Sequence, residues 1–306
     1  MLVLQQMIIF VLLMLVGAWA RKKQILTEEN QAQITQLVLN IAYPAIILSG
    51  VTGEGPHIAG PELLQAGGVI LGMLAVLLVV ARVLPRLLGF PKAEQGMVNV
   101  MTVFTNIGFM GVPMIDGIYG KDALIYMTLL LIPFNLLFFS YVIQTIKGGG
   151  AQAEPFRLKN LLNPGMISCV LALIIYLGQI KLPYVLTASI RMLGSMTGPL
   201  AMMLLGAALL ETDWKTMVNR RILVYTGIKM LVLPIVGTLA LKAFVDNTYL
   251  LATCMATLAT PSGNVLPLLA ALYNKEAYPV SVQGVALTTG AAVVTMPLVA
   301  LAVGLG

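Results

Sequence analysis

Two short stretches decide the fold: residues 105–113 read Thr-Asn-Ile-Gly-Phe-Met-Gly-Val-Pro, and residues 260–267 read Thr-Pro-Ser-Gly-Asn-Val-Leu-Pro. Each places an asparagine, glycine and proline inside an apolar segment. Proline removes a backbone donor and clashes with the preceding turn, and nearby glycines lower the cost of non-helical backbone. Both stretches therefore predict an interruption in an otherwise helical segment.

The composition of the chain indicates that these segments lie in a lipid bilayer. Of the 306 residues, 59% are hydrophobic and 10% are charged, whereas ordinary soluble domains have about 25% charged residues. A membrane-spanning helix needs about 20 apolar residues. Hydropathy, together with the polar, glycine and proline residues that separate the apolar stretches, predicts ten spans. They lie at residues 3–20, 32–50, 62–84, 93–115, 121–146, 161–180, 184–210, 219–243, 248–273 and 277–305.

Basic residues predict how the chain is oriented. The cluster at residues 21–23 follows the first apolar stretch instead of preceding it, so this stretch is predicted to be a retained span and not a cleaved signal peptide. If loops alternate between two faces, every loop lysine and arginine except Lys121, Lys181 and Lys242 falls on one face. Basic loops lie on the cytoplasmic side. We therefore expect a multi-pass protein of the plasma or inner membrane with both termini outside.

The connection at residues 148–160 is rich in glycine and divides the ten spans into two groups of five. The predicted organisation is a first five-helix repeat at residues 1–147, a cytoplasmic linker at 148–160 and a second repeat at 161–306. Because five is an odd number, related halves must have opposite orientations in the membrane.

Matching positions in the two halves support such a repeat. Tyr43-Pro44 in the second span corresponds to Gly198-Pro199 in the seventh, and the two opening stretches occupy the fourth and ninth spans. The sequence thus predicts an all-α integral membrane fold. Its ten transmembrane helices form two inverted five-helix repeats with crossing broken helices in the fourth and ninth spans.

Two interrupted helices that meet near the bilayer midplane would form a binding site for an anion. Each interruption exposes the N-terminus of a half-helix, which carries about half a positive elementary charge. Two asparagines can donate amide hydrogens to a carboxylate there. The alternative is that the prolines only kink the helices and the asparagines cap backbone groups, but the symmetric pair favours a site. The candidate substrate-binding residues are Asn106, Gly108, Pro113, Pro261, Ser262, Gly263, Asn264, Pro267, Lys229, Tyr43 and Pro44.

Two basic residues, Lys229 and Arg191, fall inside predicted spans, and no carboxylate is placed securely in mid-span. Ionisable residues within a membrane usually mark a functional site. Basic residues inside the spans, without an acidic residue in mid-span, favour an anionic substrate. They argue against a cation carrier or a carboxylate-based proton relay. The alternative is that both side chains snorkel or hydrogen-bond to the backbone.

The reactive side chains argue against an enzyme. His57 is the only histidine and lies in a loop, and Cys169 and Cys254 lie far apart in apolar runs, which excludes a disulfide framework or a thiolate metal site. An intramembrane hydrolase needs a nucleophile with a base or a metal. We expect no catalytic residue, metal or cofactor, and basic loops explain the formal charge of +6 without a nucleic-acid partner. A membrane-embedded enzyme or a receptor remains the least favoured alternative.

Taken together, residues 106–113, 261–267, 40–44 and 198–201 resemble the auxin efflux carrier family of membrane transporters, over essentially the whole chain. This resemblance implies a fold similar to that of bile-acid sodium symporters and sodium/proton antiporters. It also implies a scaffold of the first, second, sixth and seventh spans that mediates homodimerisation, and a mobile unit that carries the substrate by an elevator-like shift. Known members carry auxin or small carboxylates such as malonate and malate, and the short central loop favours a bacterial-type carboxylate carrier.

The sequence therefore predicts a secondary transporter of small organic anions, mono- or dicarboxylates, that works by alternating access. Its expected partners are the organic anion, the lipid bilayer and a second copy of the chain. The alternative on the same architecture is a sodium- or proton-coupled symporter of a bile-acid-like or neutral organic solute.

Overall fold

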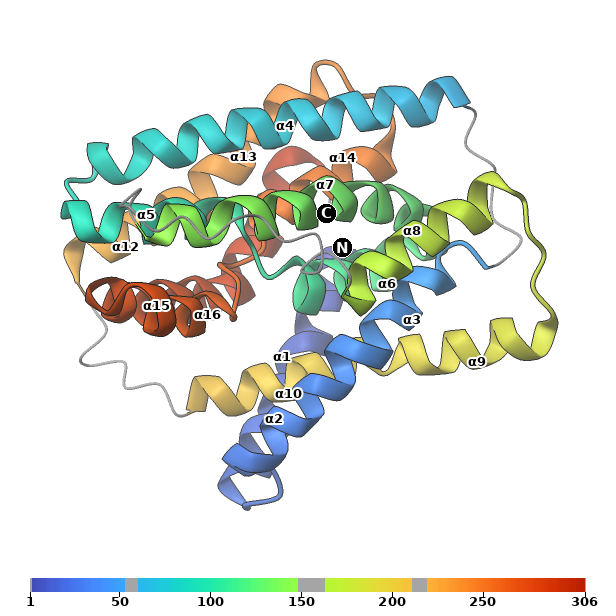
Figure 1. The fold of residues 1–306 in the computed structure, drawn as a ribbon, viewed down its shortest axis with the longest axis horizontal. Helices are drawn as coiled ribbons and strands as arrows, with labels where there is room; N and C mark the ends of the chain where they lie inside the picture. Colours follow the sequence, from blue (N-terminus) through green and yellow to red (C-terminus); the bar gives the residue numbers. More distant parts are fainter. Residues whose placement is uncertain (1, 53–59, 148–162, 211–218, 306) are drawn as a thin grey trace.

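The computed structural model describes residues 2–52, 60–147, 163–210 and 219–305 (Figure 1). His57 and the predicted linker 148–160 lie outside the described residues. All regular structure within these ranges is helical, apart from one isolated β-bridge. The helices of the first half are α1 (Leu2–Lys22), α2 (Glu28–Leu37), η1 (Val38–Ala42), α3 (Tyr43–Ser49), α4 (Gly60–Leu87), α5 (Lys92–Val103), η2 (Ile107–Gly111), α6 (Val112–Tyr119) and α7 (Lys121–Ile146).

The second half of the chain is helical as well. They are α8 (Pro164–Leu177), α9 (Tyr184–Ser195), α10 (Thr197–Leu210), α12 (Arg220–Gly227), η4 (Ile228–Val232), α13 (Leu233–Lys242), α14 (Thr248–Ala259), α15 (Leu266–Tyr273), η5 (Lys275–Ala277) and α16 (Tyr278–Val303).

Within the described ranges, seven helical segments are long and apolar enough to cross a membrane. They are Leu4–Lys22, Glu28–Ser49, Gly60–Leu87, Lys121–Ile146, Tyr184–Leu210, Arg220–Lys242 and Lys275–Val303. The three remaining predicted spans contain shorter apolar helices, at Ile107–Tyr119, Pro164–Leu177 and Thr248–Ala259. An all-helical integral membrane protein is thus confirmed, whereas the number of ten spans and the inverted repeat stay predictions.

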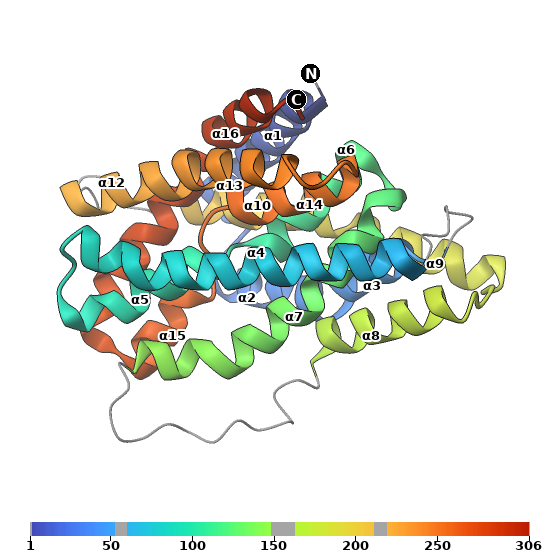
Figure 2. The same ribbon diagram turned by 90° about the horizontal axis from the view of Figure 1, so that it is seen from above.

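The helices form two sets that pack against each other (Figures 1 and 2). In the first helix set, which contains α1, α2, α3, α8, α9 and α10, α1 packs along α10 and α3 packs on α8 and α9. In the second helix set, which contains α4 to α7 and α12 to α16, α4 packs on α5 and α7, and α14 packs on α7 and α13. Each set therefore combines helices from both halves of the chain.

Two glycines allow α1 and α10 to approach closely. A Cβ atom on Gly17 would clash with the backbone of Met203, and one on Gly206 would clash with the backbone of Met14. Small residues at helix–helix contacts let backbones approach in membranes, where van der Waals packing replaces the hydrophobic effect as the driving force. The first helix set is therefore held together along α1 and α10 by backbone-to-backbone contact.

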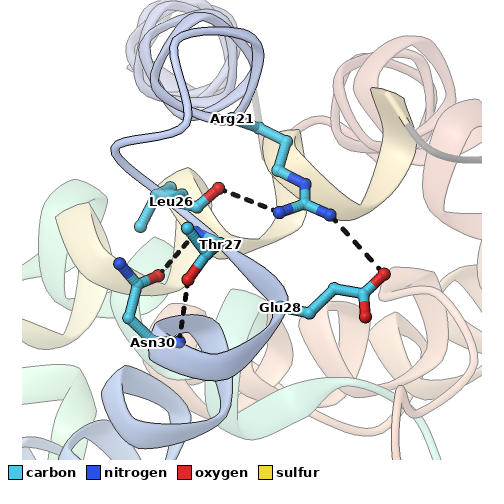
Figure 3. A network of polar contacts seen from close by, with 5 residues as sticks. All are labelled: Arg21, Leu26, Thr27, Glu28 and Asn30. Atoms are coloured by element: carbon cyan, nitrogen blue, oxygen red, sulfur yellow. Dashed lines mark hydrogen bonds and ion pairs between the residues drawn. The ribbon is translucent and has the colours of Figure 1, made fainter.

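Polar bonds fix the turn between α1 and α2 (Figure 3). Thr27 Oγ1 accepts a hydrogen bond from the Asn30 amide at 3.3 Å, and Asn30 Oδ1 accepts one from the Thr27 amide at 2.8 Å. Arg21 donates to the carbonyl of Leu26 at 3.0 Å and lies 3.7 Å from the carboxylate of Glu28. This capping box satisfies backbone donors at the start of α2 and sets the direction in which the second helix leaves the first.

We expect Gly206→Ala to lower the thermal unfolding midpoint of the purified protein in detergent. The added Cβ forces α1 and α10 apart, and overpacking of this kind costs about 1–3 kcal/mol. Gly72→Ala is the matched control, because a Cβ at Gly72 of α4 meets no atom within 4 Å. Equal midpoints for the two variants would contradict the close contact between α1 and α10.

Candidate functional site

The first interruption separates α5 from η2. The helix α5 ends at Val103, and Phe104, whose amide makes the last helical hydrogen bond to Val100, adopts an extended backbone with φ −95° and ψ 94°. Asn106, with φ −77° and ψ 49°, precedes the next helical residue, Ile107. The predicted fourth span is thus two helices joined by three non-helical residues.

The second interruption separates α14 from α15. The helix α14 ends at Ala259, and Thr260 has an extended backbone with φ −67° and ψ 147°. Helical structure resumes at Leu266, with Pro267 in the first turn of α15. The predicted ninth span is therefore interrupted in the same manner as the fourth.

The two interruptions pair with each other through their backbones. Thr105 and Ser262 form an antiparallel bridge. The Asn106 amide donates to the carbonyl of Pro261 at 2.7 Å, and the Gly263 amide donates to the carbonyl of Phe104 at 2.9 Å. Lipid offers no hydrogen bonds to backbone groups, so non-helical backbone at membrane depth must find partners within the protein. Each interruption supplies those partners to the other.

Ser262 ties this pairing to two neighbouring helices. Its Oγ donates to the carbonyl of Met101 at 2.9 Å, and its amide donates to Thr288 Oγ1 of α16 at 3.1 Å. Thr288 Oγ1 in turn donates to the carbonyl of Gly284 at 2.7 Å. Met101 lies in the last turn of α5, where carbonyls lack an intrahelical donor. The serine hydroxyl therefore satisfies a group that the interruption exposed.

Pro113 does not mark the first interruption, contrary to the prediction from its missing donor. The helix runs without a break from Ile107 through Pro113 to Tyr119. The π-helical turn η2 precedes the proline, and Val112 donates to the carbonyl of Ile107 five residues back. This wider turn accommodates the proline ring within the helix, and π-helical turns are frequent at functional sites. The chain breaks instead at residues 104–106.

Polar groups without a partner lie at and beside the crossing, by which we mean the paired interruptions at residues 104–106 and 261–263. Asn106 Nδ2, Thr105 Oγ1 and Thr197 Oγ1 have no hydrogen-bond partner within the described part of the chain. Asn106 is 4% exposed, and its side chain makes no capping bond to η2. Thr197 begins α10, which packs on η2. A buried donor without an acceptor is costly, and a bound ligand with oxygen atoms would supply the missing acceptor.

Tyr43 brings the first helix set against this crossing. A Cβ on Gly108 of η2 would lie 3.3 Å from the Tyr43 ring, and one on Gly165 of α8 would lie 3.1 Å from the opposite edge of the same ring. Pro44 follows in the first turn of α3. The side chain of Pro113 faces Gly198 of α10, where a Cβ would lie 3.4 Å away. The predicted residues Tyr43, Gly108 and Pro113 therefore lie where the two helix sets meet.

Lys229 is fully buried, with 0% of its surface exposed. Its Nζ donates to the carbonyl of Leu258 at 2.8 Å and to the carbonyl of Thr260 at 3.2 Å. Both carbonyls lie at the carboxyl end of α14, beside the second interruption. This geometry matches the alternative in which the lysine hydrogen-bonds to backbone, and it places the charge at the helix end.

The remaining predicted residues are not buried with this cluster. Asn264 is exposed, unlike Asn106, and Pro267 is half-buried in the first turn of α15. Arg191 is exposed on α9. The crossing thus brings together Asn106, Pro261, Ser262 and Gly263. Of the two predicted asparagines, only Asn106 is buried there.

The structure adds Thr105, Thr197 and Thr288 to the residues around the crossing. Sequence reasoning did not select them, because threonine hydroxyls commonly bond to the preceding turn of their own helix. Thr288 does so as well, through Gly284. The available signal is weak: Thr288 and Thr289 form a polar pair inside a long apolar run.

Comparison with known proteins agrees with this architecture. The profile of the family described as membrane transport protein matches residues 2–300. An uncharacterized transporter of Methanocaldococcus jannaschii is 27% identical over 209 residues, which are 66% of this chain and 67% of that protein. Both matches are to transport proteins, which confirms a multi-pass membrane transporter and not an enzyme. The chain therefore belongs to the auxin efflux carrier family of membrane transport proteins.

Proposed function

We propose that this protein is a secondary transporter of small organic anions, mono- or dicarboxylates such as malonate or malate. The observation that carries the proposal is the Asn106 side chain, which is 4% exposed and has an amide nitrogen without an acceptor in the described residues. It lies at the N-terminus of the helix Ile107–Tyr119. The first amides of a helix lack intrahelical acceptors and carry the positive end of the helix dipole. A carboxylate would accept hydrogen bonds from the Asn106 side chain and from the first backbone amides of this helix.

The proposed architecture has ten spans in two inverted five-helix repeats. The fourth span comprises α5, η2 and α6, and the ninth comprises α14 and α15. Two observations support this assignment: the interruptions pair with each other, and in both segments a proline follows in the first turn of the last helix. In this arrangement, Asn264 lies beside the start of α15 and supplies a second amide to the substrate.

The site favours a small substrate because Tyr43 limits the space beside Gly108, two residues after Asn106. The Tyr43 ring lies so close to Gly108 and Gly165 that neither position has room for a side chain without displacement of the ring. A compact mono- or dicarboxylate fits this constraint better than a fused aromatic acid such as auxin.

Alternating access would arise from movement of the two helix sets relative to each other. The outer half of the fourth span packs on both sets: α6 contacts α1 and α10 of the first set as well as α7 and α14 of the second, and Gly117 faces the side chain of Gln6. The inner half of the ninth span behaves differently, since α15 packs on α5, α7, α16 and η5, all in the second set. Leu268 and Leu272 of α15 are 61% and 65% exposed. With basic loops in the cytoplasm, these contacts support an inward-open conformation and an elevator-like shift.

We expect Asn106→Ala to reduce uptake of malonate or malate into proteoliposomes roughly 10- to 100-fold at subsaturating substrate. The loss of one hydrogen bond to a charged group costs about 1.5–3 kcal/mol. Thr238→Val is the matched control, because Thr238 Oγ1 of α13 is also buried and also lacks a partner in the described residues. Wild-type uptake by a variant with both Asn106→Ala and Asn264→Ala would exclude this site.

We expect a cysteine at position 268 to react with a charged, membrane-impermeant thiol reagent from the cytoplasmic side, and a cysteine at position 114 to stay unreactive. Both positions follow the proline of their segment, but Leu268 is 61% exposed and Met114 is 0% exposed. The native Cys169 and Cys254 are buried and give the background. Labelling of Met114→Cys alone, or of neither variant, in inside-out vesicles would contradict the inward-open conformation. A cysteine that faces lipid would not react, because the reagent needs a thiolate in water.

A further inference from the structure

Lys229 lies in the π-helical turn η4, between α12 and α13, and none of its surface is exposed. An ammonium group in a membrane interior needs compensation, because lipid does not solvate it. No carboxylate of the described residues forms an ion pair with Lys229. Of the acidic residues in the described part of the chain, six lie in the first turns of their helices, Asp116 lies within α6, and Asp246 precedes α14; the six are Glu28, Glu29, Glu62, Glu94, Asp122 and Glu276.

The compensation for this charge comes from the carboxyl end of α14. Lys229 Nζ lies 2.8 Å from the carbonyl oxygen of Leu258 and 3.2 Å from that of Thr260. The last carbonyls of a helix lack intrahelical donors, and together they carry about half a negative elementary charge. The interruption after Ala259 therefore creates a local negative pole in the interior of the protein, and the ammonium group occupies it.

Transporters with discontinuous helices use such a pole to bind their coupling ion. Unwound carbonyls and the carboxyl ends of half-helices coordinate the sodium ion or the proton there, while half-helix N-termini bind the anionic substrate. In this chain the two carbonyls that such an ion would use are already bonded to Lys229.

We propose that the Lys229 ammonium takes the place of a bound metal cation at the carboxyl end of α14, so that the transporter holds its crossing together without sodium. This inference rests on the proposed transport function and specifies its coupling. Lys229 is a positioning residue: it neutralises the end of α14 and thereby fixes residues 260–263, which pair with the other interruption. Removal of the amine leaves the two carbonyls facing the space that it occupied, and a sodium ion can then occupy that space.

The test compares three variants with the wild type in sodium chloride and in choline chloride of equal ionic strength. Lys229→Ser removes the charge and leaves space for an ion, whereas Lys229→Arg retains the charge. Lys242→Ser is the matched control, because Lys242 Nζ also bonds to a carbonyl near a helix carboxyl end, that of Val303 of α16, at 2.9 Å. Lys242 is exposed at the end of α13, where water replaces the amine.

The first measurement is the thermal unfolding midpoint of the purified protein without substrate. We expect no difference between the two salts for the wild type, Lys229→Arg and Lys242→Ser. For Lys229→Ser we expect a midpoint several degrees lower in choline, with recovery in sodium. A midpoint of Lys229→Ser that equals the wild type in choline, or that does not respond to sodium, overturns the proposal.

The second measurement is uptake of malonate into proteoliposomes. We expect the wild type to transport equally well in both salts, and Lys229→Ser to be at least tenfold slower in choline than in sodium. Wild-type uptake that requires sodium overturns the proposal even if Lys229→Ser does not fold. The unfolding measurement needs no substrate, so failure to find a transported anion contradicts the proposed function and leaves the test of Lys229 intact.

Discussion

The backbone hydrogen bonds between residues 104–106 and 261–263 are the constraint on which the rest of the structure depends. A single interruption in a lipid-embedded helix would leave amides and carbonyls unpaired, at a cost of several kcal/mol each. Two interruptions that pair with each other avoid this cost. The pairing holds both breaks at one position and favours glycine at residue 263, because a Cβ there would lie 3.2 Å from the Phe104 carbonyl oxygen.

Around this pairing, the hydrogen-bond acceptors at the helix ends have partners, whereas one hydrogen-bond donor does not. The carboxyl ends of α5 and α14 receive donors from within the protein, the hydroxyl of Ser262 and the ammonium of Lys229. The side-chain amide of Asn106, at the amino end of the next helix, receives no acceptor from the described residues. The carbonyls of Met101, Leu258 and Thr260 are thus satisfied, and the Asn106 side chain is left as an available donor. This is the chemistry of a site for an anion and supports the proposed substrate class.

The interruptions themselves could be predicted because glycine, asparagine and proline have local conformational effects that act wherever the chain lies. The exact break in the fourth span could not, since a π-helical turn allowed Pro113 to remain within a helix and moved the break to residues 104–106. Nor could the different burial of Asn106 and Asn264, which follows from packing: one asparagine is 4% exposed and the other is exposed on the surface of the chain.

The sequence by itself determined that this chain is a helical membrane protein with two interrupted segments, because hydropathy and backbone preference are properties of local sequence. Only the tertiary structure decided which groups those segments offer to a ligand. Lys229 and Leu258 are far apart along the chain, and no local pattern shows that the ammonium of one meets the carbonyl of the other. Charge and hydrogen bonding act over a few ångströms, so the role of each polar side chain depends on the neighbours that folding brings to it.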